Sequence, residues 1–307
     1  MAKNFSCWPK GWPQSINYPV APVFRVLDQT AERVPDRIGM IFGGMELMYW
    51  EFKDLTDRFA AALASLGVQK GDRVAIHLPN CPQFAIAYYG LLKNGAVFTP
   101  LSPMLSPREV EHQLSDSGAK FLLSLDLLYG SIAEAVGKTA VETVITTSIA
   151  DCYSAVIQPL KPLTKMPVPG TLDFAELLSK HPPQAPEVSI DPEKDLAHLA
   201  YTGGTTGVSK GVMLTHYNVL TNSLQFGLWF SGANIEEVGE GRFEVVHPPG
   251  VDPLRDRPLA RDTETLLVVV PWFHAMGTVG YLNNPVASGT TMVVFPRFDP
   301  KEYLTAI

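Results

Sequence analysis

The stretch Tyr201-Thr-Gly-Gly-Thr-Thr-Gly-Val-Ser-Lys-Gly211 is the most informative segment of the chain. It holds four glycines, three threonines and one lysine within eleven residues. Glycines allow successive backbone N–H groups to converge on an anion, and threonine hydroxyls add donors or a magnesium ligand. Lys210 would meet the outer phosphates as a mobile positive charge. The composition therefore predicts a phosphate-binding loop over 201–211.

The spacing of this segment differs from that of the P-loop NTPases. Their loop needs a glycine directly before the lysine and Ser or Thr after it, whereas Ser209 precedes Lys210 and Gly211 follows it. This spacing, together with the lack of an evident general-base constellation, disfavours a phosphotransferase or an ATPase. Residues 196–201 form a short apolar run typical of a buried strand, and residues 212–220 lead into a helical pattern. We therefore expect a strand, the loop and then a helix, an arrangement that recurs at phosphate sites.

The eleven residues resemble the signature loop of the adenylate-forming superfamily, which includes acyl-CoA synthetases, aryl-CoA ligases, luciferases and peptide-synthetase adenylation domains. Gly203 stands where most members have serine, and with residues 212–216 the segment is most similar to the fatty-acyl-CoA ligase branch. Ser209 stands where many members carry proline. Three further segments resemble family motifs, in the family's order along the chain: 47–55, 92–103 and 271–277.

The resemblance implies a role for each residue of the loop. Lys210 and Thr206 would stabilise the charge of the leaving pyrophosphate, and Thr202 would contact Mg²⁺. His274 would line the acyl and nucleotide sites without acting as a base, because carboxylate attack on the α-phosphate requires no proton removal. The residues expected to bind ATP are Tyr201, Thr202, Gly203, Gly204, Thr205, Thr206, Gly207, Val208, Ser209, Lys210 and Gly211.

The resemblance also implies a two-step reaction. A carboxylate attacks ATP to give an acyl-adenylate and pyrophosphate, and the CoA thiol then displaces AMP. ATP, Mg²⁺ and CoA are the expected cofactors and co-substrates, and a fatty or aryl acid is the expected small-molecule partner. We interpret the chain as the N-terminal part of an ATP-dependent fatty-acyl-CoA ligase. Two alternatives stay open: an aryl-CoA ligase or other adenylating enzyme, and a catalytically silent nucleotide- or pyrophosphate-binding fragment.

Several parts of the family's architecture do not follow His274 before the last residue, Ile307. These are a Tyr-Gly-x-Thr-Glu motif, an aspartate for the ribose hydroxyls, a hinge, and a mobile C-terminal domain with a catalytic lysine. We therefore expect the α/β fold of the adenylate-forming N-terminal domain, with layered sheets and helices, truncated before the β-barrel subdomain and the C-terminal lid are complete. We expect this chain alone to be inactive.

Alternating helix-period and strand-like segments indicate α/β layering. We predict an N-terminal arm over 1–21, a first α/β lobe over 22–157, a proline-rich connection over 158–192 and an incomplete second α/β lobe over 193–307. Residues 231–262 concentrate charged side chains among prolines and glycines. We interpret them as an insertion that forms an irregular, solvated excursion.

Individual elements can be placed by their end signals. Apolar spacing predicts a helix over 52–66 that ends at Gly67, and a helix around Tyr88 that closes at Gly95. Residues 106–109 have the composition of a helix start, with Ser106 as the cap, Pro107 at the first helical position and Glu109 at the third. Strands are predicted over 73–78, 121–125 and 266–273.

Composition excludes several classes of protein. The chain has 46% hydrophobic and 18% charged residues, enough to bury one large core or two smaller ones. Its formal net charge of −7 argues against a basic surface for nucleic acid. Three scattered cysteines fit a reducing compartment. The first residues lack the apolar core of a signal peptide, and the longest apolar run is too short to cross a bilayer. We expect a cytoplasmic protein that contacts a membrane surface reversibly if its substrate is a lipid. Self-association, for example as a homodimer, is a further hypothesis, because truncation would leave apolar strand edges uncovered.

The sequence leaves the acyl-binding surface open. Six apolar residues could line a tunnel or belong to the core, and we expect most of them in the core: Leu224, Phe226, Trp229, Phe230, Trp272 and Phe273. His216, which follows the loop, is expected to be a structural helix residue.

Overall fold

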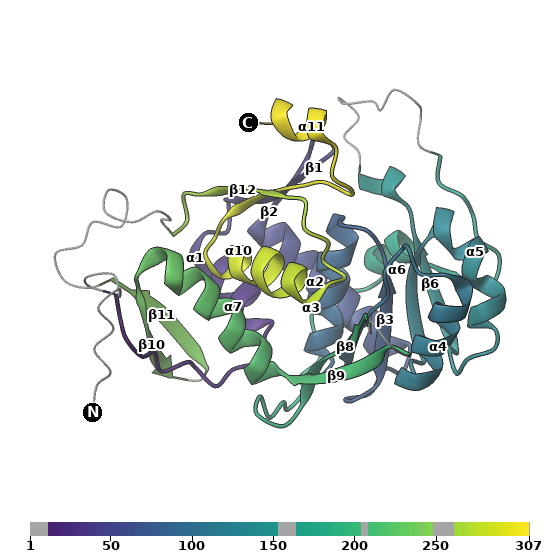
Figure 1. The fold of residues 1–307 in the computed structure, drawn as a ribbon, viewed down its shortest axis with the longest axis horizontal. Helices are drawn as coiled ribbons and strands as arrows, with labels where there is room; N and C mark the ends of the chain where they lie inside the picture. Colours follow the sequence, from purple (N-terminus) through teal and green to yellow (C-terminus); the bar gives the residue numbers. More distant parts are fainter. Residues whose placement is uncertain (1–11, 153–163, 204–207, 240, 248–260, 307) are drawn as a thin grey trace.

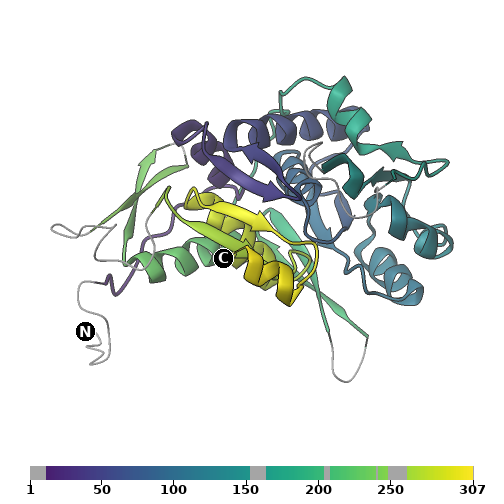
Figure 2. The same ribbon diagram turned by 90° about the horizontal axis from the view of Figure 1, so that it is seen from above.

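The computed structural model describes residues 12–152, 164–203, 208–239, 241–247 and 261–306 (Figure 1). Two sheets and a separate hairpin are joined by helices that pack between and around them (Figures 1 and 2). This arrangement confirms the predicted α/β class. Within the described residues, no helix combines the length and the apolar character needed to cross a bilayer.

The larger sheet has seven strands in the order β7-β6-β5-β3-β4-β8-β9. All neighbours from β7 to β8 are parallel, and β9 runs antiparallel to β8. Every residue of the central strands β4 and β5 is buried, as expected for a parallel sheet covered on both faces. The strands are β3 (Arg73–His77), β4 (Val97–Pro100), β5 (Phe121–Leu125), β6 (Thr143–Thr147), β7 (Leu172–Asp173), β8 (Leu196–Thr202) and β9 (Lys210–Thr215).

The smaller sheet has the strand order β12-β13-β1-β2. It combines strands from near the beginning and near the end of the described chain. β1 pairs with β2 in an antiparallel hairpin and with β13 in parallel. Both sheets therefore combine strands from the two predicted lobes, whose boundaries stay predictions. The strands are β1 (Ile38–Phe42), β2 (Met45–Met48), β12 (Thr265–Val268) and β13 (Thr291–Val294).

The helix α3 (Pro82–Lys93) lies at the centre of the helical layer, and all of its residues are buried. It packs against α2 so closely that a Cβ added at Gly90 would lie 2.9 Å from the Phe59 ring. The other helices are α1 (Arg25–Arg33), α2 (Tyr49–Ser65), α4 (Pro107–Ser117), α5 (Asp126–Val136), η1 (Ile149–Cys152), α6 (Phe174–Lys180), α7 (His216–Ser231), α9 (Ala275–Thr278), η2 (Val279–Asn283), α10 (Asn284–Ala287) and α11 (Pro300–Thr305).

The predicted helix ends are confirmed. Ser106 caps α4 by accepting from the Glu109 N–H, and the Glu109 carboxylate accepts from the Ser106 N–H at 2.8 Å. Gly67 and Gly95 follow α2 and α3 with φ of +84° and +67°, a conformation that favours glycine.

Two predictions of secondary structure are wrong: the irregular excursion over 231–262 and the length of the strand over 266–273. The described part of 231–262 contains a hairpin of β10 (Asn234–Gly239) and β11 (Arg242–Val246), in which Ile235 and Phe243 are buried. Each strand has a single buried residue, so the exposed charged side chains around it leave no two-residue period in the sequence. The strand predicted over 266–273 ends at Val268, shortly before Pro271, which has no N–H to donate to a sheet.

Three histidines are buried away from water: His77, His198 and His216. Burial lowers their pKa to about 4, about 3 and about 4. The Tyr88 hydroxyl donates to Nε2 of His198 at 2.8 Å, and the Val23 N–H donates to Nδ1 of His216 at 3.2 Å. Both rings therefore serve as neutral acceptors inside the fold, and His216 has the structural role expected of it.

We expect the free energy of unfolding to fall as the pH is lowered from 6.5, the ordinary histidine pKa, toward 4. In that window the unfolded chain binds protons that the folded chain excludes, which costs about 2 kcal/mol for each histidine at pH 5. Urea unfolding at pH 8 and pH 5 measures the difference. His77→Asn, which can still bond to Ser124, should remove about a third of it. Equal unfolding free energies at the two pH values would contradict the assignment.

Candidate functional site

The glycine-rich segment joins two antiparallel strands, β8 and β9, which project from the body of the molecule (Figure 2). The last pair of the hairpin is Thr202 with Lys210. The prediction that a helix directly follows the loop is wrong, because Thr215 caps α7 and fixes its start at His216. The run Val212-Met-Leu was too short for its period to distinguish a strand from a helix. Gly204, Thr205, Thr206 and Gly207 lie outside the described residues.

The helix α4 fastens this hairpin through three side chains. The Tyr201 hydroxyl donates to Asp116 Oδ2 at 2.6 Å, and desolvation together with this carboxylate raises the pKa of Tyr201. His112 Nε2 lies 3.1 Å from the Ser209 carbonyl oxygen, and Gln113 donates to the Ser209 hydroxyl at 3.4 Å. Ser209 thus fixes the loop by a hydrogen bond that a proline at this position could not accept.

Sequence reasoning missed these residues of α4. Arg108, His112 and Asp116 recur every four residues and so lie on one face of the helix. A polar stripe of this kind is usually a solvated surface, so its spacing alone gives no sign that it faces the loop.

The segment that carries His274 is held by Asn80, which lies between β3 and α3. The Asn80 amide donates to the Val270 carbonyl at 3.0 Å and accepts from the Trp272 N–H at 2.7 Å. The indole of Trp272, fully buried, donates to the Tyr281 carbonyl at 3.0 Å. A Cβ added at Gly277, within α9, would lie 1.8 Å from the Pro271 oxygen, so only glycine fits at this position. His274 itself is exposed next to Phe273.

The hairpin, α4 and the His274 segment enclose one cavity of about 790 Å³, a size typical of sites for small molecules. Of the residues predicted from the sequence, it is lined by Tyr201, Thr202, Gly203, Val208, Ser209 and His274. Arg108 and His112 contribute from α4. The structure therefore brings the two ends of the loop and His274 together, although 71 positions separate Gly203 from His274 in the sequence.

Lys210 and Gly211 lie in β9 and are not among the described residues that line the cavity. Lys210 is exposed and pairs with Thr202, so the two side chains share a face of the hairpin. A Cβ added at Gly203 would meet no atom of the described residues within 4 Å.

The six apolar residues that could line an acyl tunnel fall into buried and exposed groups. Leu224 and Trp272 are buried as expected, and Phe273 lines the cavity. The prediction that most belong to the core is wrong for Phe226, Trp229 and Phe230, which are 36%, 49% and 38% exposed. The leucines of α7 occupy its buried face, so these aromatic rings lie on the other side of the helix.

The family model for AMP-binding enzymes matches residues 27–307. A long-chain-fatty-acid–CoA ligase of Bacillus subtilis is 34% identical over 98% of this chain and 50% of its own length. A ligase of the same name from Escherichia coli is 33% identical over 78% of this chain and 44% of its own length. A probable 4-coumarate–CoA ligase of Dictyostelium discoideum is 25% identical over 95% of this chain. The chain spans about half the length of the curated relatives it matches.

Solved structures show the same fold. A long-chain-fatty-acid-CoA ligase from Archaeoglobus fulgidus superposes with a TM-score of 0.76 and 26% identity, over 98% of this chain and 52% of the other. An anthranilate CoA ligase in complex with anthranoyl-AMP gives a TM-score of 0.73 at 19% identity, over 91% of this chain and 46% of the other. The described part of the chain therefore has the fold of the N-terminal portion of such enzymes, as the sequence predicted.

Replacing Asn80 by alanine should loosen the His274 segment, since it leaves the partly buried Val270 carbonyl and the buried Trp272 N–H without this partner. We expect a loss of about 2–3 kcal/mol of stability and faster amide hydrogen exchange over 270–274. Asn94→Ala is a matched control, because Asn94 is also buried and bonds to the Ala60 and Gly90 carbonyls elsewhere. Unchanged exchange over 270–274 in Asn80→Ala would show that the segment is held by other contacts.

Gly211→Ala should disturb the hairpin. The added Cβ would lie 2.8 Å from Leu199 and 3.4 Å from the Tyr201 ring, whose hydroxyl bonds to Asp116. We expect overpacking to cost about 1–3 kcal/mol, or roughly 2–8 °C in the thermal midpoint. Gly203→Ala, where the space is open, should leave the midpoint unchanged. Equal midpoints for the two variants would argue against close packing beneath Tyr201.

Proposed function

Since the chain belongs to the family of AMP-binding enzymes, we propose that it forms the nucleotide-binding part of a ligase that activates a fatty acid as an acyl-adenylate for transfer to CoA. The observation that supports this proposal is the single cavity shared by the ends of the glycine-rich loop and His274. The names of the relatives from Bacillus subtilis and Escherichia coli favour a long-chain fatty acid as the carboxylate.

Adenylation moves negative charge onto the leaving pyrophosphate. Lys210 lies on the same face of the hairpin as Thr202, which lines the cavity, so its ammonium group can neutralise that charge. Thr206 keeps the role predicted for it as a further donor. The α4 contacts at Tyr201 and Ser209 hold both ends of the loop, which reduces the reorganisation needed when the charge develops.

Mg²⁺ would be held here mainly by phosphate oxygens. Within the described residues, no group of three or more His, Cys, Asp or Glu side chains could bind a metal ion. The Thr202 hydroxyl, which donates weakly to the Lys210 carbonyl at 3.5 Å, could exchange that bond for a place beside the cation. The donor set therefore fits a magnesium–nucleotide complex, in which the ion would offset phosphate charge.

His274 is exposed and lines the same cavity as α4, next to Phe273. From this position it can bound the place where the carboxylate meets the α-phosphate and can donate a hydrogen bond to either group. The ring does not have to take up a proton, because the attacking group is already an anion. CoA would follow the nucleotide as the second acceptor of the acyl group.

Carboxylate-dependent exchange of pyrophosphate into ATP tests the proposal. We would assay this chain, and a fusion of it to the C-terminal half of the Bacillus subtilis relative, with acids from acetate to palmitate and with 4-coumarate. Exchange with long-chain acids, lowered about a hundredfold or more by Lys210→Ala, is the expected result for a group that stabilises the leaving charge. Lys194→Ala, at an exposed lysine outside the cavity, is the control.

Other outcomes separate the alternatives. Pyrophosphate exchange that depends on 4-coumarate would show that the substrate is an aryl acid and not a fatty acid. Release of ADP in place of AMP would overturn adenylation. Binding of ATP without exchange in either form would leave a silent nucleotide-binding protein.

A further inference from the structure

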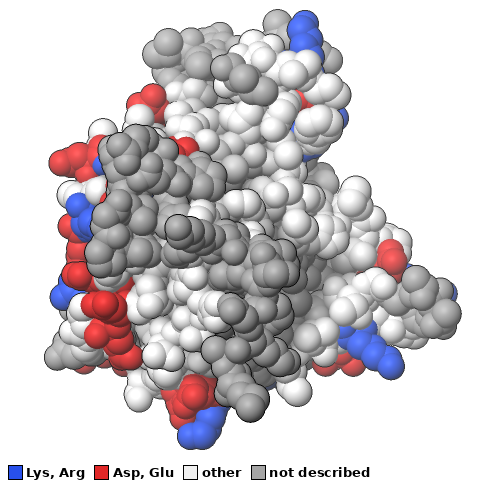
Figure 3. Space-filling view, turned by 60° about the vertical axis from the view of Figure 1, so that its left-hand side comes forward, with Lys and Arg blue, Asp and Glu red and all other residues white. Residues whose placement is uncertain are grey.

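Lys210, to which the proposed function assigns the neutralising charge, depends on its backbone for its direction. Acidic side chains gather along one edge of the face shown in Figure 3, and the net charge of the chain is −7, so the protein as a whole repels an anion such as ATP. A cation must therefore act locally. The exposed Lys210 side chain is a flexible four-carbon stem, so the backbone decides which region its ammonium group can reach.

The backbone is restrained on both sides of Lys210. Nε2 of His112, in α4, lies 3.1 Å from the Ser209 carbonyl oxygen, and the Thr202 hydroxyl donates to the Lys210 carbonyl at 3.5 Å. A carbonyl oxygen only accepts, so His112 Nε2 carries the hydrogen of its bond. The neutral ring with its hydrogen on Nε2 and the charged ring can both donate it. The contact therefore persists whichever charge the imidazole carries.

The His112 bond restrains the peptide group that joins Ser209 to Lys210. This group is planar, and the dihedrals that adjoin it are ψ of Ser209 and φ of Lys210. Fixing the carbonyl oxygen at α4 limits rotation about both dihedrals. These two angles set the direction in which β9 leaves the loop, so they also set the direction of its first side chain, that of Lys210.

The imidazole is itself held in place. Its ring lies edge to face with the Tyr201 ring, with centroids 6.4 Å apart and an interplanar angle of 81°. The Tyr201 hydroxyl donates to Asp116, one turn further along α4, at 2.6 Å. Gln113 adds a longer bond of 3.4 Å to the Ser209 hydroxyl. His112 is thus a fixed link between α4 and the backbone of the loop.

We propose that His112 is a positioning residue for adenylation, which acts through Lys210 by holding the backbone that directs the ammonium group toward the leaving pyrophosphate. The inference rests on the proposed function, in which Lys210 stabilises the leaving charge, and it adds a residue that takes no chemical part in the reaction. Such positioning matters because a displacement of about 1 Å can lower a rate roughly a hundredfold.

Pyrophosphate exchange in the fusion protein tests the positioning role. His112→Phe keeps a ring beside Tyr201 but removes the donor, and it should lower carboxylate-dependent exchange about tenfold or more. His112→Gln places an amide N–H at a similar reach and should stay within about threefold of the wild type. In a Lys210→Ala background, His112→Phe should lower the exchange by less than about twofold, because the residue through which it acts is gone.

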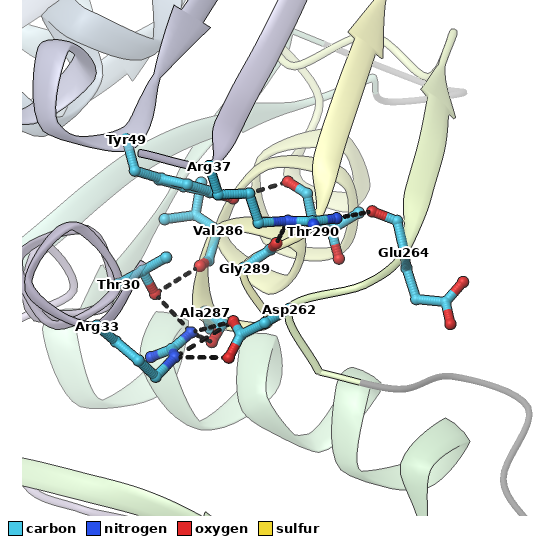
Figure 4. Close-up of polar contacts among 10 residues, drawn as sticks. All are labelled: Thr30, Arg33, Arg37, Tyr49, Asp262, Glu264, Val286, Ala287, Gly289 and Thr290. Carbon is cyan, nitrogen blue, oxygen red and sulfur yellow. Dashed lines mark hydrogen bonds and ion pairs between the residues drawn. The ribbon is translucent and has the colours of Figure 1, made fainter. Parts of the chain in front are cut away.

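Amide hydrogen exchange over 208–211 tests the hold on the loop without ATP and without catalysis. It should be faster in His112→Phe than in the wild type and unchanged in His112→Gln. Arg37→Gln is the control for a general loss of stability, because Arg37 donates to the Gly289 and Glu264 carbonyls, outside the cavity (Figure 4). It should lower the thermal midpoint and leave both pyrophosphate exchange and hydrogen exchange over 208–211 as in the wild type.

Three results would overturn the positioning role alone in an active wild-type fusion. In the first, His112→Phe leaves hydrogen exchange over 208–211 unchanged. In the second, His112→Gln is as impaired as His112→Phe. In the third, His112→Phe lowers pyrophosphate exchange as much in the Lys210→Ala background as in the wild type, which would mean that His112 acts on the nucleotide without Lys210. An inactive wild-type fusion would overturn the ligase function itself, and the positioning role with it.

Discussion

The structure depends on a chain of buried hydrogen bonds that begins on α3. Tyr89 donates to the Asn283 side chain, Asn283 donates to the Tyr88 hydroxyl, and Tyr88 donates to His198. These contacts join α3 to η2, which follows the His274 segment, and to β8, which leads into the glycine-rich loop. Because the four side chains are buried, each lost partner would leave a polar group unsatisfied in the core. The two halves of the candidate site are thus positioned from one helix that contributes no residue to its lining.

The same principle appears at both ends of α3. Asn80 precedes it and bonds to the backbone beside Trp272, and Lys93 ends it with Nζ 2.5 Å from both Asp28 of α1 and Asp57 of α2. A buried lysine between two carboxylates is costly to desolvate and is tolerated only where its partners are fixed. These polar contacts specify how the helices meet, whereas apolar packing, as at Gly90 against Phe59, supplies the driving force.

The sequence was sufficient wherever the signal is local. The α/β class, the Ser106 cap and the glycines that end α2 and α3 follow from residue types and short-range spacing, and the loop and His274 follow from the family resemblance. Features that depend on distant partners could not be predicted. Ser209 contacts Gln113 of α4, and Asp262 pairs with Arg33, which lies 229 positions away in the sequence. Thr206 and the residues around it stay predictions, since they lie outside the described residues.

The parallel pairing of β1 with β13 has a consequence for the order of folding. Met40 pairs with Met292, so one edge of β1 finds its partner only after about 250 further residues have been made. At roughly 5–20 residues per second, this delay lasts on the order of 10 to 50 seconds. The β1–β2 hairpin forms by local contact, but its free edge stays open to strands of other nascent chains during that time. The β1–β2 hairpin is therefore the place where mispairing during synthesis is expected.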